Sequence, residues 1–178
     1  GKTTLPGLIP VPSGGPGVEV AENPGAMPRW FPVPRAYRAG EPLDDMQRNA
    51  ESQFDFSKGC FIRDPRWVGT YVDCRVKELK RTPNRVELLA EGAPSASGPV
   101  PGRILLVSSE TAYPGWVFEN DWGKHRPLEV VNHAFRGVVL EPGEMHATLT
   151  FEPASFRLGL FLSLAFLGLF GALIAAWI

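Results

Sequence analysis

Residues 145–153 carry the clearest polarity pattern in the chain. Polar side chains alternate there with apolar ones, which are Met145, Ala147, Leu149 and Phe151. This period of two is typical of a strand with one buried face. Segment 70–81 alternates in the same way, and with the turn at 82–84 and the apolar run at 85–91 it predicts a β-hairpin.

Shorter strand-like patterns recur along the chain before the last apolar run. They occupy residues 28–40, 59–62, 103–111, 116–120 and 128–140. Pro32 and Pro34 place the first of them at a sheet edge, because proline cannot donate a ladder hydrogen bond. The segment 103–111 is apolar enough to be a central strand. About six to eight strands joined by short turns predict a mainly β fold, an antiparallel β-sandwich.

Residues 41–56 are the helix candidate of the soluble part. Asp44 and Asp45 lie in its first turn, where the helix dipole favours acids, and this fits them better than a catalytic pair. Apolar residues follow at helical spacing, namely Leu43, Met46 and Ala50. By contrast, residues 92–102 are rich in Gly, Pro and Ser and predict a flexible loop.

Residues 158–178 contain no charged side chain. At about 1.5 Å per residue this run is about 31 Å long, which matches the hydrocarbon core of a bilayer. We therefore predict a membrane span over 157–178, in contact with the lipid bilayer. Phe156 and Arg157 are expected at one membrane interface and Trp177 near the other.

The predicted organisation is a Pro/Gly-rich connector at 1–28, a β-rich domain at 29–156 and the span. The chain does not begin with Met and it ends inside the apolar run. We therefore expect it to be the tail of a larger protein. Its 18 Lys and Arg against 19 Asp and Glu give a net charge of −1, which argues against a nucleic-acid partner.

Candidate chemistry is sparse. Cys60 and Cys74 could form one disulfide or remain two buried thiols, and the sequence leaves both open. No pair of Cys or His residues has the spacing of zinc ligands, so no metal or cofactor is expected. His125, His133 and His146 read as ordinary strand or turn residues, and no catalytic constellation accompanies them.

The turn at 113–116, Tyr-Pro-Gly-Trp, is the main candidate for binding. Pro and Gly at its centre predict a type II turn, and the two aromatic residues can cap a sandwich without any ligand. Aromatic rings also stack on sugars, and a nearby carboxylate or guanidinium can bind hydroxyl or phosphate groups. The candidate contacts for a glycan or a lipid phosphate are Glu110, Tyr113, Trp116 and Arg136.

Several stretches, in order, resemble the C-terminal region of YfhO-like bacterial membrane proteins, which are related to glycosyltransferases of the C superfamily. The likeness begins at 22–36 and covers nearly all of the chain from there. Its strongest parts are LLVSSETAYPGW (105–116), NHAFRGVVLEPGE (132–144) and FEPASFRLGL (151–160). One departure is Trp122, which separates Asp121 from Gly123 where the family has an Asp-Gly turn.

The resemblance implies a multi-span protein of the bacterial cytoplasmic membrane that transfers sugar from a polyprenyl-phosphate donor to a cell-envelope polymer. It also implies that this chain is the extracytoplasmic C-terminal β-domain and last span, without the catalytic carboxylate, so it is not itself an enzyme. The alternative is a membrane-anchored β-sandwich that binds a glycan or a protein.

Overall fold

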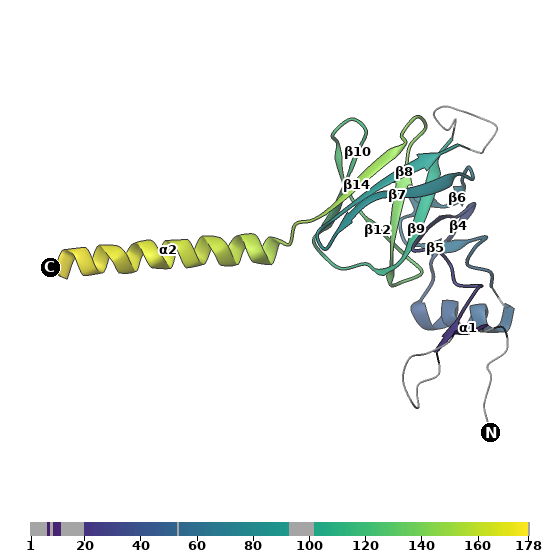
Figure 1. The fold of residues 1–178 in the computed structure, drawn as a ribbon, viewed down its shortest axis with the longest axis horizontal. Helices are drawn as coiled ribbons and strands as arrows, with labels where there is room; N and C mark the ends of the chain where they lie inside the picture. The colour runs from purple at the N-terminus through teal and green to yellow at the C-terminus, as the bar shows by residue number, and fades with distance from the viewer. Residues whose placement is uncertain (1–6, 8, 12–19, 53, 93–101, 178) are drawn as a thin grey trace, which may run out of the picture.

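The computed structural model describes residues 7, 9–11, 20–52, 54–92 and 102–177. Over these residues the protein is a β-domain from which α2 (Ala154–Trp177) extends as a single rod (Figure 1). The mainly β, sandwich-like architecture with one short helix and a C-terminal apolar helix is confirmed. The loop predicted at 92–102 lies almost wholly outside the described residues.

One layer of the sandwich is a five-stranded antiparallel sheet in the order β11-β10-β14-β8-β7. Its strands are β7 (Arg75–Thr82), β8 (Arg85–Glu91), β10 (Trp116–Asn120), β11 (His125–Pro127) and β14 (His146–Phe151). The hairpin predicted over 70–91 is β7 paired with β8, from Arg75↔Glu91 to Thr82↔Arg85, with a shift of register between Glu78 and Lys80. β14 is the alternating strand expected at 145–153, with Ala147 and Leu149 buried.

The other layer is a seven-stranded sheet in the order β3-β9-β13-β12-β5-β4-β6. Its strands are β3 (Trp30–Pro32), β4 (Arg35–Arg38), β5 (Cys60–Ile62), β6 (Gly69–Thr70), β9 (Ile104–Thr111), β12 (Glu129–Val131) and β13 (Phe135–Leu140). β4 and β5 pair in parallel, and the other pairs of this sheet are antiparallel. The proline-containing β3 lies at the edge, as predicted.

β9 has an apolar run because it is buried on both faces. Ile104 and Leu106 point into the core between the two sheets, with Leu88, Phe118 and Leu149. The intervening Leu105 and Val107 enter a second core with residues of β4, β5 and β12. The strand predicted to be central is therefore an inner strand whose two faces serve different cores.

The strand predicted over 70–81 is interrupted. Residues 71–74, which connect β6 to β7, belong to neither sheet. Backbone amides of this segment donate to carbonyl groups of distant residues instead of to a neighbouring strand. The amide of Tyr71 donates to the carbonyl of Pro34 at 2.8 Å, and the amide of Val72 donates to the carbonyl of Arg103 at 2.8 Å. A period-two pattern cannot reveal that a chain crosses from one sheet to the other, so the prediction of one continuous strand was wrong.

Outside the two layers lie α1 (Pro42–Ser52), the one-turn η1 (Pro65–Trp67) and a two-stranded sheet of β1 (Ile9–Val11) and β2 (Val20–Glu22). That small sheet falls within the segment expected to be a connector. α1 forms where predicted, but it turns its polar side to the domain. Asp45 is buried, while Leu43 and Met46 are exposed.

α2 is long and apolar enough to cross a membrane, and none of its described side chains is buried against the domain. Its 24 residues correspond to about 36 Å at the usual rise per residue. An apolar helix of this length exposed to water would be a large unfavourable surface. The helix therefore indicates membrane anchoring of the chain.

Candidate functional site

The Pro-Gly turn between β9 and β10 is fixed against the chain that leads into α2. Gly115 has a φ of 107°, a backbone conformation that favours glycine. Its carbonyl oxygen accepts a hydrogen bond of 2.6 Å from the amide of Glu152. A Cβ atom at this position would lie 2.9 Å from Cα of Pro153. The turn therefore requires glycine for two reasons, and it holds the base of α2 to the β-domain.

The two aromatic residues of this turn, Tyr113 and Trp116, both lie against Phe151 of β14. The ring centre of Phe151 lies 5.4 Å from that of Trp116 and 6.0 Å from that of Tyr113. Trp116 is partly buried against the core, whereas Tyr113 is 65% exposed. The Arg136 guanidinium lies 4.3 Å from the Trp116 ring centre, which is a cation–π contact.

Three arginines converge on Glu110. Arg81 Nη1 lies 2.7 Å from its Oε1, Arg136 Nη1 lies 3.0 Å from its Oε2, and Arg29 Nε lies 3.6 Å from Oε1. Arg81 also forms a bidentate pair with Glu78, at 2.7 and 2.8 Å. We call these five residues the arginine cluster. Its three arginines face two glutamates, which leaves one excess positive charge.

An irregularity between β9 and β13 aims Glu110 and Arg136 at each other. Phe135 pairs with Thr111, but Gly137 pairs with Val107, so β9 has extra residues at this point. The amide of Glu110 is held by the hydroxyl of Ser108 at 3.1 Å, and Arg136 Nε donates to the carbonyl of Thr111 at 2.9 Å. Bulges commonly redirect side chains in this way.

Hydrogen bonding and burial shift the pKa values of three members of the arginine cluster, Arg81, Glu78 and Arg136. A hydrogen bond to Glu78 raises the pKa of Arg81, and the same contact lowers the pKa of Glu78. Burial lowers the pKa of Arg136, and the Glu110 carboxylate opposes that shift. Arg136 Nη1 has no hydrogen bond of good geometry despite its 3.0 Å approach to Glu110, so this contact is a charge interaction.

The structure thus brings together all four residues predicted as candidate contacts: Glu110, Tyr113, Trp116 and Arg136. Their binding of a ligand stays a prediction. Sequence reasoning missed Arg29, Glu78 and Arg81, which come from β7 and the residue before β3. Arg81 is the basic residue at the end of the predicted strand 70–81, but nothing in the sequence pattern paired it with Glu110.

The three predicted interface residues lie at the two ends of α2. Phe156 and Arg157 are in its first turn and Trp177 is its last residue, and all three are exposed. Arg157 Nη2 lies 4.0 Å from a carboxylate oxygen of Glu152. These positions match the two edges of a bilayer core, and the anchoring role of each side chain stays a prediction.

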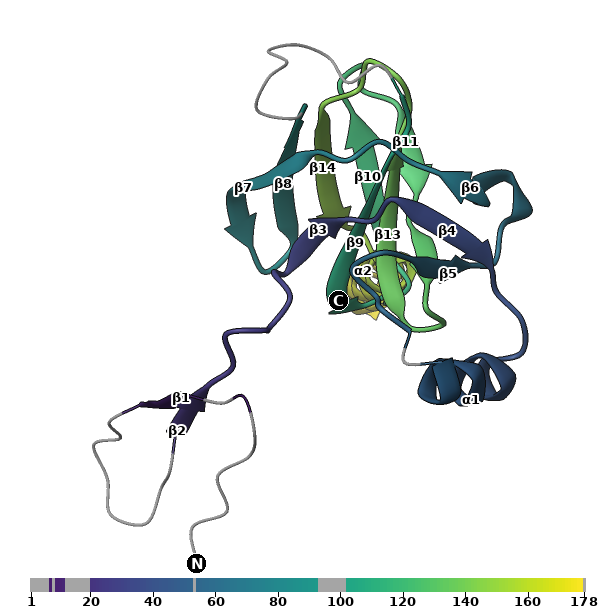
Figure 2. The ribbon, with the colours of Figure 1, turned by 90° about the vertical axis from the view of Figure 1, so that its right-hand side faces the viewer.

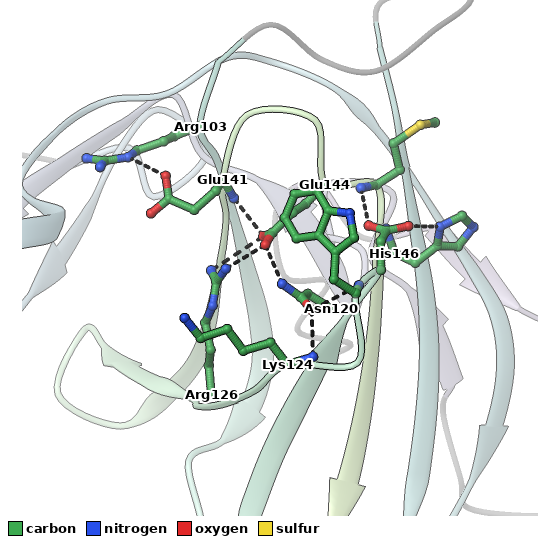
Figure 3. Close-up of polar contacts among 10 residues, drawn as sticks. Arg103, Asn120, Lys124, Arg126, Glu141, Glu144 and His146 are labelled. Carbon is green, nitrogen blue, oxygen red and sulfur yellow. Dashed lines mark hydrogen bonds and ion pairs between the residues drawn. The ribbon is translucent and has the colours of Figure 1, made fainter.

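A second polar centre surrounds Glu144, in the turn between β13 and β14 (Figure 3). Its carboxylate is 0% exposed. Oε1 lies 2.5 Å from Arg126 Nη2 and 2.5 Å from Asn120 Nδ2, and Oε2 accepts the amide of Glu141 at 2.8 Å. Nearby, Asp121 accepts from the amides of Met145 and His146. These bonds join the β10–β11 hairpin to the turn between β13 and β14, which connects the two sheets.

Beside Glu144 is a pocket of about 440 Å³. Its lining combines cations, carboxylates and aromatic rings: Arg66, Trp67, Phe118, Lys124, Arg126, Pro127, Glu129, Val139 and Glu141. Trp67 Nε1 donates to Glu129 at 2.9 Å. Burial raises the pKa of Glu129, and this hydrogen bond opposes the shift. The pocket therefore offers both donors and acceptors to a polar ligand.

The structure decides the state of the two cysteines, which the sequence left open, and it shows a contact between His133 and Asp45 that the sequence did not predict. Cys60 and Cys74 are free, buried thiols, and burial raises their pKa values to about 12 and about 11, so neither is a reactive nucleophile at neutral pH. His133, predicted to be ordinary, lies 2.8 Å from the buried Asp45 and fastens α1 to the domain. Over the described ranges, no group of three or more His, Cys, Asp or Glu could hold a metal ion.

Comparison of the chain with protein-family models, with curated proteins and with solved structures finds no match.

Proposed function

We propose that this chain is the non-catalytic extracytoplasmic β-domain and last span of a YfhO-like membrane glycosyltransferase. The whole protein would transfer sugar from a polyprenyl-phosphate donor to a cell-envelope polymer at the bacterial cytoplasmic membrane. Its catalytic carboxylate would lie outside this chain. The observation that carries the proposal is that the three stretches most similar to the family meet at one point beside α2.

The meeting point is made of contacts between stretches far apart in sequence. Stretch 105–116 contributes Glu110 and Trp116 to the contacts with Arg136 of stretch 132–144. Stretch 151–160 contributes Phe151, which packs on Trp116, and the Glu152 amide bonded to the turn. A chance likeness would have no reason to gather its residues in space. Their convergence supports a shared structural unit.

In this proposal the domain positions the last span and the membrane surface next to it. The carbonyl of Gly115 is hydrogen-bonded to the amide of Glu152, two residues before α2. Because Gly115 also lies close to Pro153, a tilt of the domain would be transmitted to the helix. The arginine cluster stiffens the same end through ion pairs that are partly shielded from water. The domain would contribute to sugar transfer by holding the last span in a fixed orientation relative to the other spans.

The test uses the whole protein encoded around this chain and the chain alone, each reconstituted in proteoliposomes with a radiolabelled polyprenyl-phosphate sugar. We expect transfer by the whole protein and none by the chain. In the whole protein, Gly115→Ala should reduce transfer, whereas Gly143→Ala should not. Gly143 is the matched control because its φ is 89° and a Cβ there meets nothing within 4 Å.

Transfer by the chain alone would contradict the non-catalytic assignment. A whole protein of about the size of this chain, seen as an intact mass near 19.5 kDa, would contradict the multi-span parent. Equal loss of transfer in the two glycine variants would refute the positional role of the turn while leaving the transferase itself standing.

A second candidate function, a membrane-anchored binding module, is favoured by the pocket beside Glu144. Its volume suits a small saccharide, and its mixed donors and acceptors suit hydroxyl groups. Lys124 has no ion pair with any described residue, and Trp122 is exposed on the same hairpin turn. Glycan-array binding by the chain in micelles, lost in Lys124→Ala and kept in Lys80→Ala, would favour this function over the first.

A further inference from the structure

The open side of the arginine cluster is formed by Arg29. Its side chain is 55% exposed, and its closest anionic contact is the 3.6 Å approach of Nε to Glu110, which is too long for a hydrogen bond. Among the described residues its two terminal amino groups have no acceptor. Arg81 and Arg136 lie behind it, with their side chains 25% and 10% exposed. The cluster is thus closed on the domain side and open on one side.

The arginine cluster lies close to the level at which α2 meets a bilayer. The 24 residues of α2 span about 36 Å, about one turn more than a hydrocarbon core of about 30 Å. The first turn, which holds Phe156 and Arg157, therefore reaches the headgroup region. Trp116 packs on Phe151, three residues before α2, and Arg136 lies on Trp116. A continuous row of contacts leads from the membrane interface to the cluster.

The donors and the net charge of the arginine cluster suit a phosphate group. A guanidinium presents two parallel N–H donors that match phosphate oxygens, and one excess positive charge remains after the two glutamates are counted. The exposed Tyr113 ring borders the same turn, as aromatic residues do at membrane interfaces. An anionic headgroup in the same leaflet would reach Arg29 from the open side.

We propose that the arginine cluster binds the phosphodiester headgroup of an anionic glycerophospholipid, with Arg29 as its direct contact. The bound lipid would hold the base of the β-domain against the membrane surface. Arg81 and Arg136 act by positioning and by their charge, since both are already engaged with glutamates. The inference needs only a membrane-inserted α2 and does not rest on the proposed transferase.

The experiment is native mass spectrometry of the full chain released from neutral detergent micelles that contain equal amounts of phosphatidylglycerol and phosphatidylcholine with identical acyl chains. We expect adducts of phosphatidylglycerol to exceed those of phosphatidylcholine at least tenfold. Arg29→Gln should lower this ratio about fivefold, the effect expected for one arginine at an anionic surface. Arg29 is chosen because its exposed side chain can be replaced without opening the core.

The matched control is Arg75→Gln, which removes the same charge from the opposite end of β7, where Arg75 pairs with Glu91 in register. It should leave the lipid ratio unchanged. Equal retention of the two lipids, or an equal fall in both variants, would overturn the proposal. Displacement of phosphatidylglycerol by an equal concentration of inorganic phosphate would also overturn it, because the site would then be one for a free anion.

Discussion

Glu110 and Glu144 both hold arginine side chains at the ends of strands, but their surroundings differ. Glu144 is fully buried and bonded to Arg126, Asn120 and a backbone amide. Glu110 is 27% exposed and faces three arginines, of which the outermost points to solvent. Glu110 is linked through Trp116 to the base of α2. Glu144 lies in the turn between β13 and β14, at the end of β14 opposite to the end that leads into α2.

The difference in burial and pairing indicates that Glu144 stabilises the fold, whereas the cluster around Glu110 keeps charge available for a ligand. A buried carboxylate must be paired completely, because desolvation costs more than a single contact returns. Glu144 meets that requirement within the domain, because Arg126, Asn120 and the Glu141 amide all bond to its carboxylate. The arginine cluster keeps an excess cation on its open side. Figure 2 places this contrast in the fold, with α2 behind the domain and β11, which carries Arg126, at its upper part.

Glu144→Gln should have the largest effect on stability. The substitution keeps the size of the side chain but leaves Arg126 without its anion in a largely buried place. We expect the free energy of unfolding to fall by about 3 kcal/mol. Urea unfolding of the chain in micelles, followed by tryptophan fluorescence, measures it.

Glu141→Gln is the matched control in the same turn. Glu141 pairs with Arg103 at 2.9 Å, and both side chains are partly exposed, so its loss should cost less than about 1 kcal/mol. Equal costs in the two variants would contradict the distinction between a buried and a surface pair.

The coupling between turn and span gives the next effect. Gly115→Ala imposes an unfavourable positive φ and places a methyl group against Pro153, so we expect a loss of about 2–3 kcal/mol. Gly143→Ala carries only the backbone term, about 1 kcal/mol. The same unfolding measurement compares them. If Gly143→Ala costs as much, the close approach to Pro153 contributes nothing.

Glu110→Gln is expected to separate stability from binding. It removes the anion shared by three arginines, and because Glu78 still pairs with Arg81, the loss should be about 1–2 kcal/mol. The same change adds one excess positive charge at the open side. Retention of phosphatidylglycerol over phosphatidylcholine should therefore rise about fivefold while stability falls. A fall in both quantities would mean that Glu110 shapes the lipid site rather than limiting its charge.

Much of the fold could be predicted because it follows from local pattern. The alternation at 145–153 and the double-sided apolar run of β9 specify strands directly. The break at Tyr71 and the three-residue β11 could not be predicted, because backbone bonds to distant segments decide them. The exposed apolar side of α1 was also unexpected, since a buried Asp45–His133 contact orients that helix.

The candidate site was predictable only in part, for a similar reason. Glu110 and Trp116 stand out by residue type near a recognisable turn, and Arg136 stands out by its charge in an otherwise apolar stretch. Arg29 joins them only because β3 pairs with β9 along Trp30↔Ser108, and this register is not readable from the chain. Glu144 looked like an ordinary turn residue, because burial of a carboxylate depends on partners up to 24 positions away.

Trp116→Phe should have the smallest effect on stability. It tests whether Trp116 links the arginine cluster to Phe151 at the base of α2. A phenyl ring keeps the packing on Phe151 but weakens the contact with the Arg136 guanidinium, so we expect a loss of about 0.5–1 kcal/mol. Trp122→Phe, in the exposed turn between β10 and β11, should cost nothing measurable. If the cation–π contact positions Arg136, Trp116→Phe should also lower the retention of phosphatidylglycerol, although its charge is unchanged. An unaltered lipid ratio together with lost stability would mean that Trp116 stabilises the sandwich and that the ion pairs alone position the cluster.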